Sequence, residues 1–215
     1  AVEARVPLVL VVTENVPLHD SIRLLALARE GGTTVVGPNS VGVISPGARL
    51  KLGAIGGDDP ERAFVPGRVG VISRSGGLTA EVGLQLKRAG LGVSTAISIG
   101  GDAMIGSRPA DLLRRFRQDR ETAAVIYVGE PGTRLEEELA DEVACDQRLP
   151  VVALVLGQFM EDFPLGTVFG HAGAVIEGGQ GGPTEKKRRL AEAGAHVAES
   201  FDDVIPLVRD LIGSG

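Results

Sequence analysis

A histidine with small neighbours on both sides is the residue of this sequence whose possible chemistry is easiest to state. His171 lies in the run GHAGA, at residues 170–174. Small neighbours leave little side-chain packing around the imidazole, which argues against a role as core filler. An imidazole nitrogen can accept a phosphoryl group and pass it on, which divides one difficult transfer into two easier ones. The alternative for any single histidine is a structural or surface role, which we assign to His19 and His196.

The start of a predicted helix offers a place for an anion. The segment SRSGG, at residues 73–77, lies directly between a predicted strand and a predicted helix. Small residues let an anion approach the backbone, and the unpaired N–H groups of a first helical turn point at it. We therefore predict that Ser75, Gly76 and Gly77 bind phosphate. A serine N-cap followed by a tight turn is the alternative, because it needs the same residue types.

Two further turns carry a carboxylate directly after a predicted strand. In the turn GEPG, at residues 129–132, Glu130 could orient an imidazole by accepting a hydrogen bond from its ring N–H. A solvated turn glutamate is the alternative. The turn GGD, at residues 100–102, could approach an anion or could be a plain loop. A metal site is not predicted, since no second histidine or cysteine lies at ligand spacing from His171.

These residues need elements that bring them together, and the hydrophobic pattern predicts such elements. Short runs of Val, Ile and Leu alternate with longer stretches of helical pattern, which is typical of a parallel sheet with crossover helices. We expect strands at residues 7–13, 34–36, 68–73, 92–99, 123–129, 150–156 and 196–198, and helices at 18–30, 77–89, 109–119, 135–144, 184–193 and 201–212. In an open parallel sheet, ligands bind beyond the carboxyl ends of the strands.

The predicted elements divide the chain into three parts. Residues 68–215 hold five strands with intervening helices, which makes a complete doubly wound α/β domain of flavodoxin-like size. Residues 45–67 are rich in Gly, Pro and Asp and are predicted to be a linker. Residues 1–44 offer two strands and one helix, too little to enclose a core. Ala1 to Ala4 read as the tail of a helix, so we expect part of a domain to be missing on the N-terminal side.

Composition excludes several classes of protein. The chain has 215 residues, a formal net charge of -6 and 3% aromatic residues, which does not fit a nucleic-acid binder. One cysteine, Cys145, rules out an internal disulfide and any multi-cysteine metal site. No apolar run reaches the roughly 18 residues of a membrane span, and no signal peptide is visible. We therefore expect a cytoplasmic protein without a membrane or nucleic-acid partner.

Taken in order along the chain, the motifs are specific. The succession SRSGGLT, IGGD, GEPG and GHAGA resembles the phosphohistidine domain of the alpha subunits of the succinyl-CoA synthetase family. That family belongs to the superfamily of NDP-forming acyl-CoA synthetases and ATP-citrate lyase. The resemblance extends upstream to VTE at residues 12–14, GPN at 37–39 and ISPG at 44–47, and so covers nearly the whole chain.

The resemblance implies a role for each of these segments. Residues 1–44 correspond to the end of a Rossmann-like CoA-binding domain, of whose CoA contacts Val12, Thr13 and Glu14 remain. His171 corresponds to the histidine that a nucleoside triphosphate phosphorylates, and Glu130 to its hydrogen-bonding glutamate. Ser75, Gly76 and Gly77 correspond to the start of one of two helices that hold the phosphate.

The resemblance also implies partners and a substrate. The second helix and the site for ATP or GTP with Mg belong to an ATP-grasp beta subunit, so this chain is not expected to use a nucleotide alone. Phosphohistidine converts a carboxylate to an acyl phosphate, and CoA then forms the acyl-CoA, as in the tricarboxylic acid cycle.

The surroundings of the substrate depart from the family pattern. The resemblance assigns substrate-binding positions to Asn39, Ser40 and Ala80. Ser40 follows the GPN turn, where the family continues with Cys-Pro. Ala80 lies at a position where the family has Tyr. A small dicarboxylic or hydroxy acid is expected. A malate–CoA ligase, a citrate-lyase-like relative and a non-catalytic regulatory paralogue are the alternatives.

Overall fold

Two sheets organise the chain, and one of them is much larger. The computed structural model describes residues 1–215 except 165, 168–169, 177–180 and 214–215. The strands are β1 (Leu8–Leu10), β2 (Thr34–Val36), β3 (Gly42–Ser45), β4 (Leu50–Gly53), β5 (Pro66–Ser73), β6 (Val93–Ser98), β7 (Ala124–Gly129), β8 (Val151–Val155) and β9 (His196–Ala198). The helices are α1 (Leu18–Gly31), α2 (Gly76–Arg88), α3 (Pro109–Phe116), α4 (Leu135–Cys145), α5 (Pro183–Glu192) and α6 (Phe201–Gly213), with short 3-10 helices η1 (Pro60–Arg62) and η2 (Gln158–Asp162).

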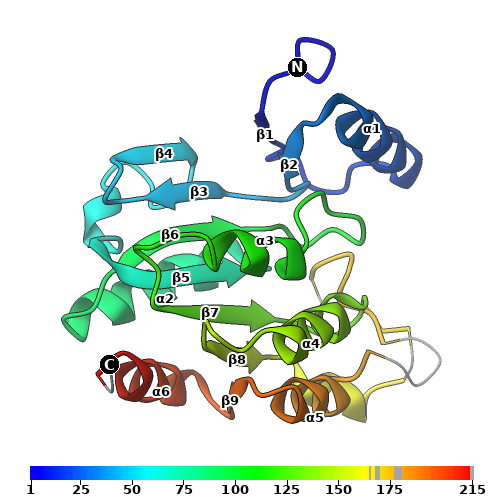
Figure 1. Ribbon diagram of the computed structural model, residues 1–215. Coiled ribbons are helices and arrows are strands. Elements are labelled where there is room, and N and C mark those ends of the chain that lie inside the picture. The colour runs from blue at the N-terminus through cyan, green and yellow to red at the C-terminus, as the bar shows by residue number, and fades with distance from the viewer. Residues whose placement is uncertain (165, 168–169, 177–180, 214–215) are drawn as a thin grey trace.

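The larger sheet has the predicted doubly wound topology. Its strand order is β4-β3-β6-β5-β7-β8-β9, with the β3–β4 hairpin at one edge and β9 at the other (Figure 1). The five strands from β5 onward pair in parallel in the order β6-β5-β7-β8-β9. Numbered from β5, this is the flavodoxin-like order 2-1-3-4-5. The predicted α/β fold class is therefore confirmed.

Two hydrophobic layers hold the helices onto this sheet. Successive strand residues face opposite sides, so Val71 belongs to one core cluster and Ile72 to the other. Helices α3, α4 and α5 pack on the Ile72 side, whereas α2 and α6 pack on the Val71 side. Both residues are at most 1% exposed, which explains why the strands read as continuous apolar runs rather than as alternating ones.

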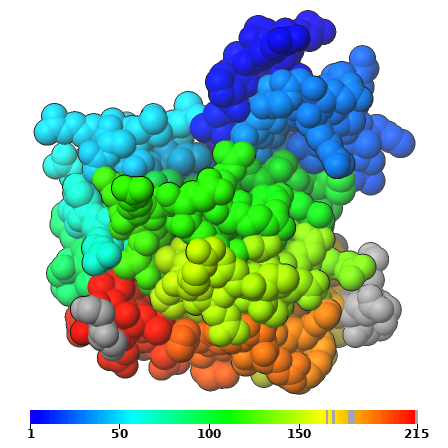
Figure 2. All heavy atoms as spheres, in the orientation of Figure 1, coloured from blue at the N-terminus to red at the C-terminus, as the bar shows by residue number. Residues whose placement is uncertain are grey.

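The first part of the chain forms a smaller unit. Strands β1 and β2 pair in parallel, and α1 connects them. The unit projects from the main body as the dark blue lobe of Figure 2. Strand β1 is shorter than the predicted 7–13. The expected helix tail at Ala1 to Ala4 is wrong, because residues 2–5 form a turn that is closed by a hydrogen bond from the Arg5 amide to the Val2 carbonyl.

The segment predicted as a linker is folded. Residues 45–67 contain β4 and η1, and the expected boundary at 44 falls inside β3, which pairs antiparallel with β6. Ile55 and Phe64 are each 1% exposed and belong to the core cluster under α2 and α6. Gly, Pro and Asp serve tight turns as well as linkers, which is why composition misled the prediction. The division into domains stays a prediction.

Among the described residues, no helix is long and apolar enough to cross a membrane.

The close packing of β5 against α3 generates a stability prediction. A Cβ on Gly70 would lie 2.7 Å from a ring carbon of Phe116, within the core. We expect Gly70→Ala to lower the free energy of unfolding by about 1–3 kcal/mol, the usual cost of overpacking. Urea denaturation measures this change. Gly77→Ala is the matched control, because its Cβ meets nothing within 4 Å, and equal loss in both variants would contradict the packing argument.

Candidate functional site

The turns that follow β5, β6 and β7 meet the loop that carries His171. The Gly173 amide donates to the carbonyl of Gly101, 3.0 Å away, in the turn after β6. The loop also contacts Gly132, after β7, where an added Cβ would lie 2.2 Å from the Gly173 carbonyl oxygen. Parallel strands place their carboxyl ends at one edge of the sheet, so residues distant in the sequence converge there (Figure 1).

His171 and Glu130 form the hydrogen-bonded pair at the centre of this edge. The distance from His171 Nδ1 to Glu130 Oε2 is 2.6 Å. The imidazole is 33% exposed and the Glu130 side chain 14%. An ionised carboxylate only accepts hydrogen bonds, so Nδ1 carries the proton. In the neutral ring, Nε2 then keeps a free lone pair.

The charge state of His171 depends mainly on this contact. The hydrogen bond to Glu130 raises the pKa of His171 above its usual 6.5. Partial burial and the positive charge of Arg74 oppose the rise in pKa, and the negative charge of Asp102 supports it. The carboxylate therefore stabilises positive charge on the ring, as a phosphorylated imidazole also needs.

A cavity of about 280 Å³ connects this pair with the start of α2. Ser75 and Leu78 line one side of it, and Glu130 and His171 line another. The structure thus brings together the predicted imidazole, its carboxylate and the predicted phosphate-binding helix start.

The amides at the start of α2 are not equally available. Ser75 is the N-cap, and its Oγ accepts from the Leu78 amide at 3.4 Å. The Ser75 amide donates to Ser73 Oγ at 3.1 Å and is therefore occupied. Gly76 and Gly77 open the first helical turn, where backbone N–H groups have no intrahelical acceptor. Of the three predicted phosphate-binding residues, these two glycines offer amides to an anion.

The GGD turn supports the imidazole. A Cβ on Gly101 would lie 2.4 Å from Cγ of His171, so a side chain at this position would displace the ring. Sequence reasoning left the turn open between an anion site and a plain loop, and it missed this close approach. Nothing in the local sequence indicates it, because residues 101 and 171 are joined only by the tertiary structure.

Arg74 is the other residue that sequence reasoning missed. Its side chain is 1% exposed, and its Nη2 lies 2.9 Å from Glu130 Oε1. An arginine placed directly after a buried strand, between Ser73 and Ser75, was the available signal. A buried charge requires a partner, and Glu130 is that partner.

The predicted CoA segment lies in the loop between β1 and α1. Val12, Thr13 and Glu14 are exposed, and the Thr13 carbonyl accepts from the Asn39 amide at 2.8 Å. The loop is thereby fastened to the GPN turn. The contact of Val12, Thr13 and Glu14 with CoA stays a prediction.

The three predicted substrate residues lie outside the His171 cavity. The Ser40 side chain is buried, and its hydroxyl donates to the Ser98 carbonyl and accepts from the Gly42 amide. Both hydrogen-bonding roles of the hydroxyl are thus taken, so a substrate contact through it is not supported. Ala80 is half-buried and packs against the core under α2, while Asn39 is half-buried beside Gly100.

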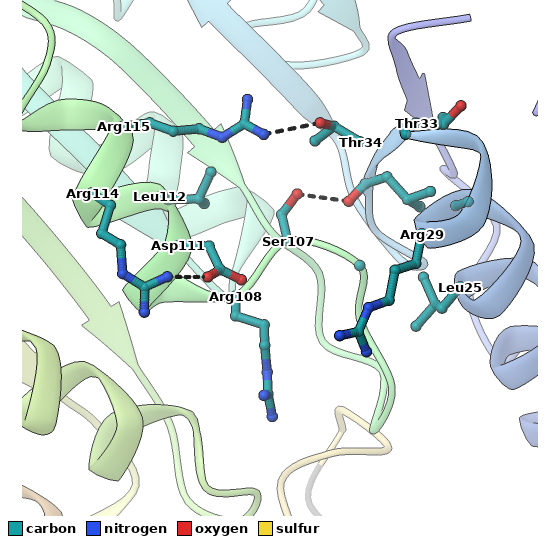
Figure 3. Close-up of a pocket in the computed structure, with 14 residues that line it drawn as sticks. Leu25, Arg29, Thr33, Thr34, Ser107, Arg108, Asp111, Leu112, Arg114 and Arg115 are labelled. Atoms are coloured by element: carbon teal, nitrogen blue, oxygen red, sulfur yellow. Dashed lines mark hydrogen bonds and ion pairs between the residues drawn. The ribbon is translucent and has the colours of Figure 1, made fainter. Parts of the chain in front are cut away.

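A larger cleft lies elsewhere, between the small unit and α3 (Figure 3). It has a volume of about 730 Å³ and is lined by Arg29 of α1 and Arg115 of α3, among others. Arg115 donates to Thr34 Oγ1 at 3.1 Å, and Arg114 pairs with Asp111 at 2.5 Å. None of the predicted site residues lines this cleft, so volume alone does not locate the chemistry.

Comparison with known proteins agrees with this geometry. Residues 72–197 match the family described as CoA-ligase. The chain is 41% identical over 212 residues to the succinate–CoA ligase [ADP-forming] subunit alpha 2 of Archaeoglobus fulgidus, covering 99% of this chain and 71% of that protein. It is 36% identical over 217 residues to an ADP-forming sulfoacetate-CoA ligase subunit of Bilophila wadsworthia, covering 99% and 71%.

A solved structure shows the same architecture. ATP citrate lyase of Methanosaeta concilii, in complex with (3S)-citryl-CoA, superimposes with a TM-score of 0.90 at 30% identity. The match covers 97% of this chain and 35% of that one. Sequence and structure comparisons lead to the same result: the chain belongs to the CoA-ligase family.

Proposed function

We propose that this chain is the alpha-type part of an NDP-forming acid–CoA ligase similar to succinate–CoA ligase, and that His171 carries the phosphoryl group. The observation that carries the proposal is the cavity that His171, its hydrogen-bonded partner Glu130 and the α2 N-cap residue Ser75 line together. This arrangement leaves Nε2 as the nucleophile and supplies donors for phosphoryl oxygens.

The proposed reaction has three steps, and groups of this chain serve the phosphorylation of His171. Nε2 forms a bond to the terminal phosphorus of a nucleoside triphosphate while the bond to the nucleoside diphosphate oxygen breaks. Glu130 holds the Nδ1 proton and stabilises the positive ring, and the Gly76 and Gly77 amides bind the phosphoryl oxygens. A carboxylate oxygen of the acid then attacks phosphorus, and the P–N bond breaks. The CoA thiolate finally attacks the acyl carbon, and phosphate leaves.

The nucleotide with Mg is assigned to an ATP-grasp beta subunit. Support comes from the relatives, several of which are named as alpha subunits of ADP-forming ligases. This chain would contribute one helix start, that of α2, and the partner a second cationic element on the open side of His171. The Val12–Glu14 segment would contribute to CoA binding, since it is exposed in the loop after β1.

Succinate or another small dicarboxylic acid is the proposed substrate. The naming of the relatives at 39–41% identity supports succinate. A hydroxy acid is the second candidate, favoured by the TM-score of 0.90 with a citrate lyase and by the small side chain of Ala80.

The first prediction concerns the histidine itself. In the complex with its beta subunit, His171→Ala is expected to abolish labelling of this chain by γ-labelled ATP, and the label on the wild type should be acid-labile and base-stable. The free energy of unfolding should change by less than about 1 kcal/mol, because the ring is one-third exposed and its sequence neighbours are small. His196→Ala, on an exposed strand residue, is the matched control. An unlabelled wild type would favour the non-catalytic paralogue.

A second prediction concerns the pKa of His171. Glu130→Gln should lower this pKa, since the largest contribution raising it is lost while burial and Arg74 still oppose protonation. NMR titration of the imidazole measures the change. A histidine whose pKa is higher in the folded state than in the unfolded state stabilises the fold when it is protonated. This stabilisation is complete below the unfolded pKa of about 6.5, and it is lost as the pH rises through the folded pKa. The stability difference between wild type and variant should therefore shrink as the pH rises above about 6.5 and passes through the folded pKa of His171. An unchanged pKa would remove Glu130 from the site.

A third prediction concerns the anion. In crystals grown with sulfate or phosphate, we expect density at the Gly76 and Gly77 amides, within reach of His171. Gly77→Pro removes one donor at a position with open space and should weaken phosphate binding, measured by calorimetric titration. Gly77→Ala keeps the N–H group and should bind as the wild type does. Equal affinity in both variants would place the phosphate elsewhere.

A further inference from the structure

Arg74 is a buried cation whose contacts reach two other turns, those after β6 and β7. Its Nη2 lies 2.9 Å from Glu130 Oε1 and 3.1 Å from the Asp102 carbonyl oxygen. Its Nη1 donates to Thr133 Oγ1 at 3.2 Å. These partners follow β7 and β6, whereas Arg74 itself follows β5. A guanidinium held in this way has little freedom to move.

The carboxylate of Glu130 is shared between two groups. Oε1 faces Arg74, and Oε2 accepts the Nδ1 proton of His171 at 2.6 Å. A carboxylate that bridges a fixed guanidinium and an imidazole cannot rotate without breaking one contact. The orientation of the His171 imidazole therefore depends on Arg74, although Arg74 makes no hydrogen bond to the ring.

The partners of Arg74 are fixed in turn. The Asp102 carboxylate accepts from the amides of Asn15 and Val16, at 3.4 and 3.3 Å, so it fastens the loop after β1 to the site. The carbonyl of Thr133 accepts from the buried ammonium of Lys186 at 3.3 Å. The position of Arg74 is thus determined by the packing of the turns and not by solvent.

We propose that Arg74 is a positioning residue for phosphoryl transfer at His171, acting through Glu130. The inference rests on the proposed function of His171. The guanidinium keeps the Glu130 carboxylate turned toward Nδ1, which selects the tautomer with Nε2 unprotonated. Without it the carboxylate can rotate, and the ring can adopt the tautomer in which Nε2 carries the proton and cannot attack phosphorus.

The tautomer of His171 gives a readout that needs no activity. Within the part of the chain that the structure describes, the charged groups that face the ring are Glu130, Arg74 and Asp102. We expect ¹⁵N NMR of the neutral imidazole to show Nδ1–H in the wild type, a shift toward Nε2–H in Arg74→Gln, and a smaller shift in Arg74→Lys, which keeps the charge. A folded Arg74→Gln variant with the wild-type tautomer would overturn the proposal. If that variant fails to fold, Arg74→Lys decides: an unchanged tautomer and an unchanged phosphorylation rate would both count against a positioning role.

A double-mutant cycle in the complex with the beta subunit provides the kinetic test. Because Arg74 acts through Glu130, we expect Arg74→Gln and Glu130→Gln each to slow phosphorylation of His171 by at least about 10²-fold. The double variant should be no slower than the slower single variant, within about twofold. Effects that multiply would show that Arg74 acts independently of Glu130 and would overturn the proposal. An unlabelled wild type would instead refute the proposed function, and the NMR measurement would still decide the role of Arg74.

Discussion

The carboxylate of Glu130 is the group on which the candidate site depends. One oxygen faces the buried guanidinium of Arg74 and the other accepts the Nδ1 proton of His171. The Glu130 side chain is 14% exposed, and these two contacts fix the orientation of its carboxylate and, through it, that of the ring. Removing its charge leaves Arg74 buried without its ionic partner and His171 without its orienting acceptor.

The parallel sheet brings the turns of the candidate site together. Strands β5, β6 and β7 are neighbours in the sheet, and their carboxyl ends place Arg74, Asp102 and Glu130 at one edge. Close approach there requires glycine, since Gly101 lies against the imidazole and Gly76 against Val41, where an added Cβ would lie 2.6 Å from a methyl carbon. The high glycine content of the chain thus includes positions where a side chain would displace the site.

The site is also linked to the smaller unit. Asp102 joins the loop after β1 through two backbone amides, and its own carbonyl joins Arg74. Asp102 therefore contacts both Arg74 and the two residues that directly follow the Val12–Glu14 segment proposed for CoA. The cleft of about 730 Å³ lies on a different part of this boundary and has polar contacts of its own. Chemistry, rather than cavity size, identifies the site.

Much of this protein was determined by sequence alone. The alternation of apolar runs and helical stretches predicted the doubly wound order from β5 to β9. The succession of motifs indicated the family and, with it, His171 and Glu130. Both signals depend on residue types at neighbouring positions, which the sequence shows directly. The β3–β4 hairpin was missed because turn residues serve linkers and hairpins equally. Only the tertiary structure decided four features: the occupied Ser75 amide, the Ser40 hydroxyl that already donates to the Ser98 carbonyl, the need for glycine at residue 101, and the pairing of Arg74 with Glu130. Each of these features depends on groups that folding brings together. The groups around Ser40, Gly101 and Arg74 lie many residues apart in the sequence.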